Sequence, residues 1–340
     1  MSKYPSVNYI GNKEKVAEWI IESLPIKQGT VLDLFCGGCS VSYALKRRGF
    51  RVIANDALFS NFVLAKAIIE NYDINLDQND YESIKLNSKT IEKKYVEIEG
   101  YFTNKLYFEQ EVLELAKLSL MAKKLNGYKK YIFMALLRRA MIRKIPYSRM
   151  NIKWEEIQKL RDEEYSYKKY GRYRHYHNIS FIEHIEQNIE DYNHAVFETD
   201  LFSEAMNCDA LDCVKKIMEK IDVIYMDPPY PSTMNKYDQF YGAFDLLFDR
   251  NTKIKLDLTN KETFLINFTR IIKACVGKTK YIAISLNNNC YPNVEILLYN
   301  ISKYIKSYVI KEKEHAYKVT NKNNKHNNYE VLLICELKEK

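Results

Sequence analysis

The sequence predicts an α/β protein with a mainly parallel sheet and a large, mostly helical insertion. Strand-like apolar runs alternate with helical patterns near the N-terminus and again from about residue 209, as in successive βαβ units. Between these parts, residues 72–199 are charged, rich in Tyr and biased towards helix. That segment is too long for a loop. We therefore expect one domain from residues 1–71 and 200–340 and a second, inserted domain from residues 72–199.

The composition is that of an ordinary globular protein. Of 340 residues, 46% are apolar and 28% charged, and 52 basic against 44 acidic side chains give a net charge of +8. No run of about 18 apolar residues occurs, so we expect no membrane span. The N-terminus lacks the apolar core of a signal peptide, which predicts a cytoplasmic location. Seven scattered cysteines do not suggest a disulfide framework, so reduced thiols are expected.

The N-terminal part contains a βαβ unit. The apolar run VLDLF, residues 31–35, predicts a buried strand that leads into a glycine-rich loop. Apolar residues at helical spacing follow over residues 40–50, where Gly49 is a typical helix-ending residue. RVIAND, residues 51–56, predicts the second strand, and residues 58–72 predict a further helix. The two strands are therefore expected to be parallel neighbours.

The same alternation resumes in the C-terminal part. The apolar run DVIYM predicts a buried strand, which two prolines then end. The last two strand-like runs are separated by a long loop rich in Asn and Lys, which predicts an antiparallel hairpin. The expected elements are helices at 209–221, 261–277 and about 292–302, and strands at 222–230, 278–289, 306–320 and 327–337.

The most informative motif is Asp227-Pro228-Pro229-Tyr230, at the end of a predicted strand. Ligands of open α/β sheets bind at the carboxyl ends of the strands. The two prolines make a stiff turn and remove two N–H donors, so carbonyl groups remain available as acceptors. Acceptors beside a flat aromatic ring suit a planar substrate that carries an exocyclic amino group. The alternative is an ordinary strand end with a proline turn.

With the glycine loop upstream, this motif makes the chain resemble the alpha-group, Dam-like DNA adenine-N6 methyltransferases of restriction–modification systems. Asp-Pro-Pro-Tyr is the catalytic signature of methyltransferases that modify adenine N6 or cytosine N4. In the alpha group a cofactor motif comes first, a target-recognition region is inserted next, and Asp-Pro-Pro-Tyr follows, which is the order here. The resemblance implies a Rossmann-like, S-adenosylmethionine-dependent catalytic domain and makes the inserted domain at 72–199 the target-recognition, DNA-binding domain.

The resemblance also implies a cofactor site. YIGNKEKV looks like the family's N-terminal motif, so Tyr9, Gly11 and Lys13 would help to hold the methionine end of S-adenosylmethionine. Asp33 would accept from the cofactor's ammonium group in the glycine loop, and Asp56 would bind the ribose hydroxyls. The expected cofactor set is Tyr9, Lys13, Asp33, Phe35, Cys36, Gly37, Asp56, Asp227 and, for the adenine amino group of the cofactor, Asp209.

Cys36 and Cys39 flank two glycines in this loop. Their spacing alone suggests thiol–disulfide chemistry or half of a zinc site. A redox pair opens a helix in a small domain of its own, however, and leaves Asp-Pro-Pro-Tyr unexplained. We therefore interpret the stretch as a strand-to-helix cofactor loop. Cys39 departs from the family, which usually has Gly there, and adds a side chain where the backbone approaches the cofactor.

Basic residues gather in two segments of the insertion. Residues 138–154 combine Arg and Lys with polar side chains, and residues 166–178 interleave basic residues with Tyr. Such segments neutralise phosphates and offer stacking faces to bases, although a solvated surface is the alternative. His175 and His177 lack further ligands, so we expect no metal site. The expected DNA-binding residues are Arg138, Arg139, Arg143, Lys144, Ser148, Arg149 and Asn151.

The chemistry implied by the resemblance explains the residue types of the catalytic motif. Hydrogen bonds from adenine N6–H to the Asp227 carboxylate and the Pro228 carbonyl would localise a lone pair that the ring otherwise delocalises. The target base must be flipped out of the duplex, and Tyr230 would stack on it. Tyr241 or Phe244 would cover its other face, unless both only fill the core. The expected catalytic residues are Asp227, Pro228, Pro229 and Tyr230.

Other interpretations stay open at this point. A cytosine-N4 or RNA-base methyltransferase would keep the chemistry and change the acceptor. A non-catalytic DNA-binding protein on a decayed methyltransferase fold is a further alternative, and the presence of both cofactor and catalytic motifs argues against it. The main interpretation implies S-adenosylmethionine as cofactor and double-stranded DNA as substrate. It also implies a partner restriction endonuclease that acts on the same site.

Overall fold

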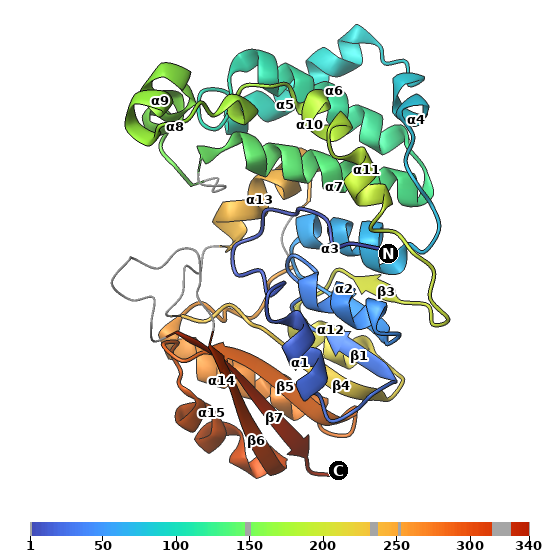
Figure 1. The fold of residues 1–340 in the computed structure, drawn as a ribbon, viewed down its shortest axis with the longest axis vertical. Helices are drawn as coiled ribbons and strands as arrows, with labels where there is room; N and C mark the ends of the chain where they lie inside the picture. The colour runs from blue at the N-terminus through green and yellow to red at the C-terminus, as the bar shows by residue number, and fades with distance from the viewer. Residues whose placement is uncertain (1, 147–150, 232–236, 251–252, 315–327, 340) are drawn as a thin grey trace. The chain divides into compact units, whose positions relative to one another are not determined.

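The computed structural model describes residues 2–146, 151–231, 237–250, 253–314 and 328–339. The chain folds into two compact units (Figure 1). The predicted insertion, residues 72–199, belongs to the first unit as far as residue 198, and this unit also takes in segments before and after it. Unit 1 comprises Met1–Tyr9, Leu58–Glu198 and Asp238–Thr252, and unit 2 comprises Ile10–Ala57, Thr199–Tyr237 and Lys253–Lys340.

Unit 2 is built around a single sheet. In the described part of the chain, seven strands lie in the order β3-β2-β1-β4-β5-β7-β6, and the pairs from β3 to β5 are parallel. β7 is antiparallel to both β5 and β6. This mostly parallel sheet confirms the predicted α/β, Rossmann-like class. The strands are β1 (Thr30–Asp33), β2 (Arg51–Asn55), β3 (Glu204–Met206), β4 (Ile221–Met226), β5 (Thr279–Asn287), β6 (Ile305–Glu314) and β7 (Tyr329–Leu337).

Helices join the parallel strands of unit 2, because a parallel connection needs a crossover. α1 packs on α2, and α14 packs on both α12 and α15. The central strands β1, β2, β4 and β5 are buried at most positions, which explains their continuous apolar runs. The helices are α1 (Ala17–Ser23), α2 (Ser40–Arg47), α12 (Ala210–Lys216), α14 (Lys261–Cys275), α15 (Val294–Ile301) and the 3₁₀ turn η4 (Ser302–Tyr304).

The C-terminal strands form the predicted antiparallel hairpin. β6 and β7 pair from Ile305 with Leu337 to Glu314 with Tyr329. β7 is buried at most positions, whereas β6 is exposed along nearly its whole length. β6 is an edge strand of the described sheet, and β3 forms the opposite edge (Figure 1). The predicted Asn- and Lys-rich loop, residues 321–326, and the end of the predicted strand at 306–320 lie outside the described residues.

In the described residues of unit 1, the regular secondary structure is helical apart from an isolated bridge between Thr103 and Tyr107. α7 is its central helix: it packs against α3, α6 and α10, and buried side chains lie on nearly all of its sides, as expected for a helix that is apolar all round. α5 packs along α6. The elements are α3 (Phe59–Ala65), the π-helix η1 (Lys66–Glu70), α4 (Gln78–Glu82), α5 (Ser88–Phe102), α6 (Glu109–Lys124), α7 (Gly127–Lys144), α8 (Trp154–Arg161), α9 (Glu163–Tyr170), the 3₁₀ turn η3 (His175–His177), α10 (Phe181–Glu186), α11 (Ile189–Asn193) and α13 (Tyr237–Leu247). The first residue of α13, Tyr237, is assigned to unit 2, and the rest of this helix belongs to unit 1.

None of the described helices combines the length and the apolar character needed to cross a bilayer.

Candidate active site

Three neighbouring strands of unit 2 deliver acidic residues to one edge of the sheet. β1 ends at Asp33, β2 is followed by Asp56, and β4 is followed by Asp227. β1 lies between β2 and β4 and is parallel to both. The carboxyl ends of these strands therefore meet at the same edge, which is where open α/β sheets bind their ligands. The structure thus brings together three of the residues that the sequence analysis selected.

Asp33 is almost completely buried, with 1% of its surface exposed. Ser42 of α2 donates a hydrogen bond from Oγ to Oδ2 of Asp33 at 2.6 Å. The other oxygen, Oδ1, has no hydrogen-bond partner among the described residues. Burial, together with the nearby Asp227 and Asp56 carboxylates, raises the pKa of Asp33 to about 7. A buried acceptor of this kind favours a cationic donor.

The loop after β1 is held by backbone hydrogen bonds. The backbone N–H of Gly37 donates to Oδ2 of Asp56 at 2.9 Å, and that of Cys36 donates to the Asn55 carbonyl at 2.9 Å. Cys39 precedes α2 with a left-handed φ of 61°, a conformation that ordinarily favours Gly. Phe35 packs partly buried against the sheet core. The loop therefore closes with Cys39 at the family's usual Gly position.

The two cysteines of this loop are close but not bonded. Their Sγ atoms are 3.8 Å apart, compared with about 2.0 Å in a disulfide. Both side chains are buried. A hydrogen bond from Cys39 and burial raise the pKa of the Cys36 thiol well above its usual range, which disfavours the reactive thiolate. This environment argues against thiol–disulfide chemistry at the two cysteines.

Asp227 has a basic partner that the N-terminal motif provides. Nζ of Lys13 lies 3.4 Å from Oδ1 of Asp227 and 3.0 Å from Oε1 of Glu330 in β7. Burial raises the pKa of Asp227 to about 6, an effect that Lys13 reduces and Glu330 increases. The Asp227 side chain keeps 24% of its surface exposed, so solvent moderates this shift. At neutral pH Asp227 is therefore mainly a carboxylate that accepts hydrogen bonds.

The aromatic residue of the motif is anchored in the sheet. Tyr230 is 4% exposed, and its hydroxyl donates to the Ser285 carbonyl of β5 at 2.7 Å. Its ring packs against Phe264 with a centroid distance of 5.5 Å. Pro228 is buried and Pro229 is half-buried. The hydroxyl bond and this packing fix the orientation of the Tyr230 ring directly after the prolines.

Two further residues of the expected cofactor set are committed to other contacts. Asp209 caps α12 by accepting from the Leu211 N–H at 3.0 Å, and its other oxygen accepts from the N–H groups of Lys255 and Leu256. Tyr9 belongs to unit 1, where its ring stacks on Tyr241 at 4.9 Å. Tyr9 thus belongs to the other unit, and Asp209 fixes the backbone at the start of α12 and at Lys255 and Leu256.

The residues expected to contact DNA occupy different environments in unit 1. Arg138 is 1% exposed and donates to Oδ1 of Asn61 at 3.0 Å. Lys144 is also buried and pairs with Glu111 at 2.8 Å. Arg139 and Arg143 are half-buried. Arg139 donates to the Ser6 carbonyl, and the Arg143 guanidinium lies 3.7 Å from the Tyr176 ring centroid. Asn151 is exposed. Ser148 and Arg149 lie outside the described residues.

The Tyr-rich segment of unit 1 presents an aromatic stack. Tyr167 and Tyr173 are 50% and 52% exposed, and their rings stack at 4.5 Å. The His175 ring continues this stack, 5.5 Å from Tyr173. His177, in contrast, is buried, and burial lowers its pKa to about 4. Among the described residues, no group of three or more His, Cys, Asp or Glu side chains is arranged to hold a metal ion.

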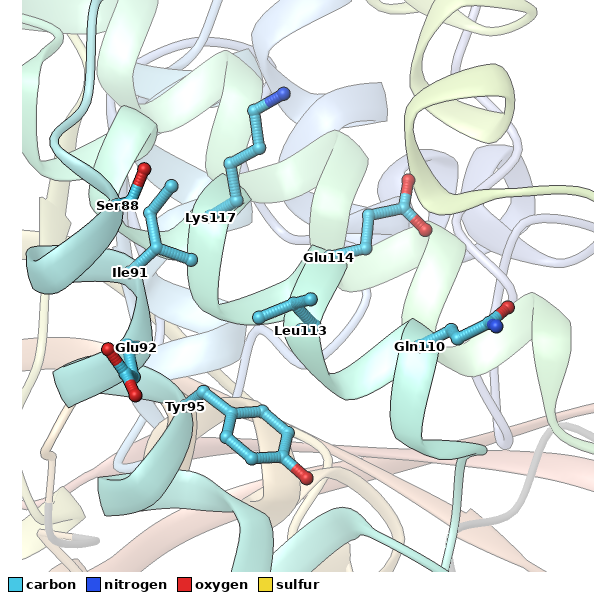
Figure 2. Close-up of a pocket in the computed structure, with 8 residues that line it drawn as sticks. All are labelled: Ser88, Ile91, Glu92, Tyr95, Gln110, Leu113, Glu114 and Lys117. Carbon is cyan, nitrogen blue, oxygen red and sulfur yellow. The ribbon is translucent and has the colours of Figure 1, made fainter.

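A pocket of about 560 Å³ lies in unit 1 (Figure 2). It is bordered by α5 and α6, and Ile91 and Leu113 supply apolar side chains to it from these two helices. None of the expected catalytic, cofactor or DNA-binding residues lines it. Its lining is Ser88, Ile91, Glu92, Tyr95, Gln110, Leu113, Glu114 and Lys117.

Glu330 and Ser42 are the residues that the sequence analysis missed. Glu330 interrupts the apolar run YEVLLICEL, and a charged residue inside a buried strand is itself a signal of a specific partner. Ser42 lies in α2, where a serine on a buried helix face carries little information by itself. Its contact with Asp33 depends on how α2 packs on β1.

Comparison with known proteins fits this geometry. The family model of the D12 class N6 adenine-specific DNA methyltransferases matches residues 9–262. A Type II methyltransferase, M2.HphI of Haemophilus parahaemolyticus, is 42% identical over 340 residues, which are 98% of this chain and 98% of that protein. A tRNA/tmRNA (uracil-C(5))-methyltransferase of Vibrio atlanticus (strain LGP32) is 30% identical over 87 residues, 26% of this chain and 22% of that protein. The chain belongs to the D12 class N6 adenine-specific DNA methyltransferases.

Proposed function

We propose that this adenine-specific DNA methyltransferase binds S-adenosylmethionine at the acidic edge of unit 2 and methylates a flipped adenine beside Asp227. The observation that carries the proposal is the group of carboxylates at the ends of β1, β2 and β4. Because the substrate is DNA, we propose that the protein works in the cytoplasm. The full-length similarity to a Type II methyltransferase supports a role in protecting DNA from a partner endonuclease with the same recognition site.

The chemistry of this edge fits a cationic cofactor. Four carboxylates lie at this edge, those of Asp33, Asp56, Asp227 and Glu330, and Lys13 contacts two of them, Asp227 and Glu330. The unpartnered Oδ1 of Asp33 is suited to accept from the cofactor's ammonium group. Asp56 follows β2, where a carboxylate can accept from ribose hydroxyls. When bound, S-adenosylmethionine supplies an electrophilic methyl group on a positively charged sulfur.

The residues of the motif activate the nucleophile. The Asp227 carboxylate and the Pro228 carbonyl accept the two N6–H groups of adenine, which concentrates the lone pair on the nitrogen and stabilises its developing positive charge. Asp227 can then take up the proton that the methylated nitrogen releases, because its pKa of about 6 lies close to neutrality. The partial exposure of its side chain lets that proton leave to solvent.

DNA contacts are proposed on unit 1. Arg143 and Arg139 are half-buried and can reach phosphates while their stems pack on the protein. The exposed stack of Tyr167, Tyr173 and His175 offers aromatic faces to nucleotides. Arg138 and Lys144 act differently, because both are buried and paired within the unit. We propose that these two residues support the shape of the surface and do not contact DNA.

The function is tested by modifying a plasmid that carries no adenine methylation. The purified protein is incubated with this plasmid and S-adenosylmethionine, and modified bases are mapped by long-read sequencing. We expect N6-methyladenine at every copy of one short sequence and at no other position. N4-methylcytosine at such sites would show that the methyl group is transferred to cytosine N4 and not to adenine N6. Unmodified DNA, with labelled methyl groups found in RNA, would overturn the proposal.

A further inference from the structure

Glu330 is a charged residue in β7, a strand whose other buried residues are apolar. It is 0% exposed, and its neighbours Val331, Leu332 and Leu333 are buried core residues of β7. An ionised carboxylate in such a place is costly unless a cation and hydrogen bonds compensate for its lost hydration. The position of Glu330 therefore calls for a specific explanation.

The topology brings Glu330 to the edge that carries the acidic residues. β5 is parallel to β4, so Asn287 at the end of β5 lies at the same edge as Asp227 after β4. β7 runs antiparallel to β5, and Glu330, near the start of β7, pairs in register with Asn287. Glu330 therefore reaches the candidate active site across one intervening strand.

Lys13 connects the two carboxylates. Its Nζ lies 3.0 Å from Oε1 and 3.3 Å from Oε2 of Glu330, and 3.4 Å from Oδ1 of Asp227. The Lys13 side chain is only 9% exposed, and its backbone N–H donates to Oγ of Ser40 at 3.1 Å. Lys13 is thus held at its backbone and at its ammonium end. Of the two carboxylates, Glu330 is the nearer to the Lys13 ammonium group and Asp227 is the more distant.

This arrangement has a consequence for hydrogen bonding at Asp227. A lysine with one carboxylate partner would pair closely with it and occupy the oxygens that N6–H needs. Because the Lys13 ammonium group lies nearer to Glu330 than to Asp227, the Asp227 carboxylate can still accept a hydrogen bond from N6–H. Its contact with Lys13 nevertheless fixes its orientation. We propose that Glu330 is a positioning residue, which acts through Lys13 to aim the Asp227 carboxylate at the amino group of the target adenine. This inference rests on the proposed function.

The electrostatics of the edge give the inference a distinctive signature. The negative charge of Glu330 raises the pKa of Asp227, while Lys13 lowers it. The other titratable groups that act on this site are Asp33 from β1, Tyr225 from β4, Tyr230 after the prolines and Cys290 after β5. Replacing Glu330 by Gln removes one negative charge that raises the pKa of Asp227, and it also removes that charge from beside Tyr225 and Cys290. It should therefore move the acid limb of the pH–rate profile to lower pH.

The test compares Glu330→Gln with the wild-type enzyme in steady-state methylation of unmodified plasmid DNA. We expect kcat to fall roughly 10-fold to 100-fold, as for a misaligned reacting group, with S-adenosylmethionine affinity changed less than about twofold. The acid limb should move to lower pH. Glu336→Gln is the matched control, because Glu336 lies on the same strand and pairs with Lys306 at 3.1 Å. This control should behave as the wild type.

A double-variant comparison keeps the test decisive if Glu330→Gln is too unstable to assay. In a Lys13→Met background, adding Glu330→Gln should leave kcat unchanged, because the residue acts through Lys13. A further fall of about tenfold would overturn the inference. So would an unchanged kcat and pH profile in folded Glu330→Gln. Failure of the proposed function is distinguished by the wild-type enzyme itself, which would then make no N6-methyladenine.

Discussion

Ser42 binds one oxygen of Asp33 and leaves the other oxygen unpartnered within the described structure. The Ser42 hydroxyl donates to Oδ2 at 2.6 Å, whereas Oδ1 has no hydrogen-bond partner. The serine thus fixes the plane of the carboxylate, and the second oxygen is oriented but unsatisfied. A buried acceptor without a partner destabilises the cofactor-free protein, and a cation that donates a hydrogen bond to it removes this destabilisation.

The first prediction concerns cofactor affinity. Asp33→Asn should weaken S-adenosylmethionine binding at least about tenfold, because a hydrogen bond to a charged group contributes roughly 1.5–3 kcal/mol. Isothermal titration calorimetry measures this directly. Asp222→Asn is the matched control: Asp222 accepts from the Thr30 N–H at the opposite end of β1, so its substitution should leave the affinity unchanged. Equal affinities in all three proteins would remove Asp33 from the cofactor site.

The second prediction concerns stability as a function of pH. The pKa of Asp33 is raised to about 7 in the folded chain, above the unfolded value of about 4. The folded state therefore favours the protonated carboxyl, and the resulting stability is present at low pH and lost as the pH rises through 7. Asn imitates the protonated form, so Asp33→Asn should be more stable than the wild type at pH 8 by up to about 4 kcal/mol.

Urea unfolding without cofactor, at pH 5 and pH 8, measures this difference. The advantage of Asp33→Asn should shrink towards pH 5 and should reverse when saturating S-adenosylmethionine stabilises the wild-type protein. A stability difference that does not change with pH would contradict the assignment of a raised pKa to Asp33.

The third prediction concerns the catalytic carboxylate. Asp227→Ala should abolish methylation and leave cofactor binding largely intact. In the wild type, turnover should fall as the pH drops through about 6, because protonation removes the acceptor that N6–H needs. Single-turnover rates between pH 5 and pH 8.5, with calorimetry on the variant, test both parts. Undiminished turnover in Asp227→Ala would refute the proposed mechanism.

The fourth prediction separates two arginines on one helix. Arg143→Ala should weaken DNA binding to all sequences and lower the salt slope of log Kd by about 1, as for one lost phosphate contact. Arg138→Ala should instead destabilise the fold by about 2–4 kcal/mol, since it removes a buried side chain bonded to Asn61. Salt-dependent fluorescence anisotropy and urea unfolding distinguish them. Equal salt slopes for wild type and Arg143→Ala would exclude this contact.

Much of the fold could be predicted from the sequence, because buried parallel strands leave continuous apolar runs. β1, β2, β4 and β5 were located by such runs, and the hairpin of β6 and β7 is confirmed. β3 was missed because it spans only Glu204–Met206 and is not fully buried. The π-helical turn at Lys66–Glu70 has no periodic signal distinct from the α-helix that it continues.

Site residues that lie at the ends of strands could be predicted from the sequence, whereas the burial of basic residues, which depends on tertiary packing, could not. Asp33, Asp56 and Asp227 could be selected because each follows a recognisable strand. Arg138 and Lys144 were selected for charge alone, and their burial depends on Asn61 and Glu111, which are distant in sequence. A run of basic residues does not distinguish buried pairs from exposed side chains.

The central claim is that Asp227 activates adenine N6 at the acidic edge of unit 2. Nucleoside mass spectrometry of DNA treated with wild type or Asp227→Ala, each saturated with S-adenosylmethionine, tests it most directly. The account predicts N6-methyldeoxyadenosine with the wild type and none with the variant, although both bind the cofactor. N4-methyldeoxycytidine as the product, or equal N6-methyldeoxyadenosine from the two proteins, would contradict it.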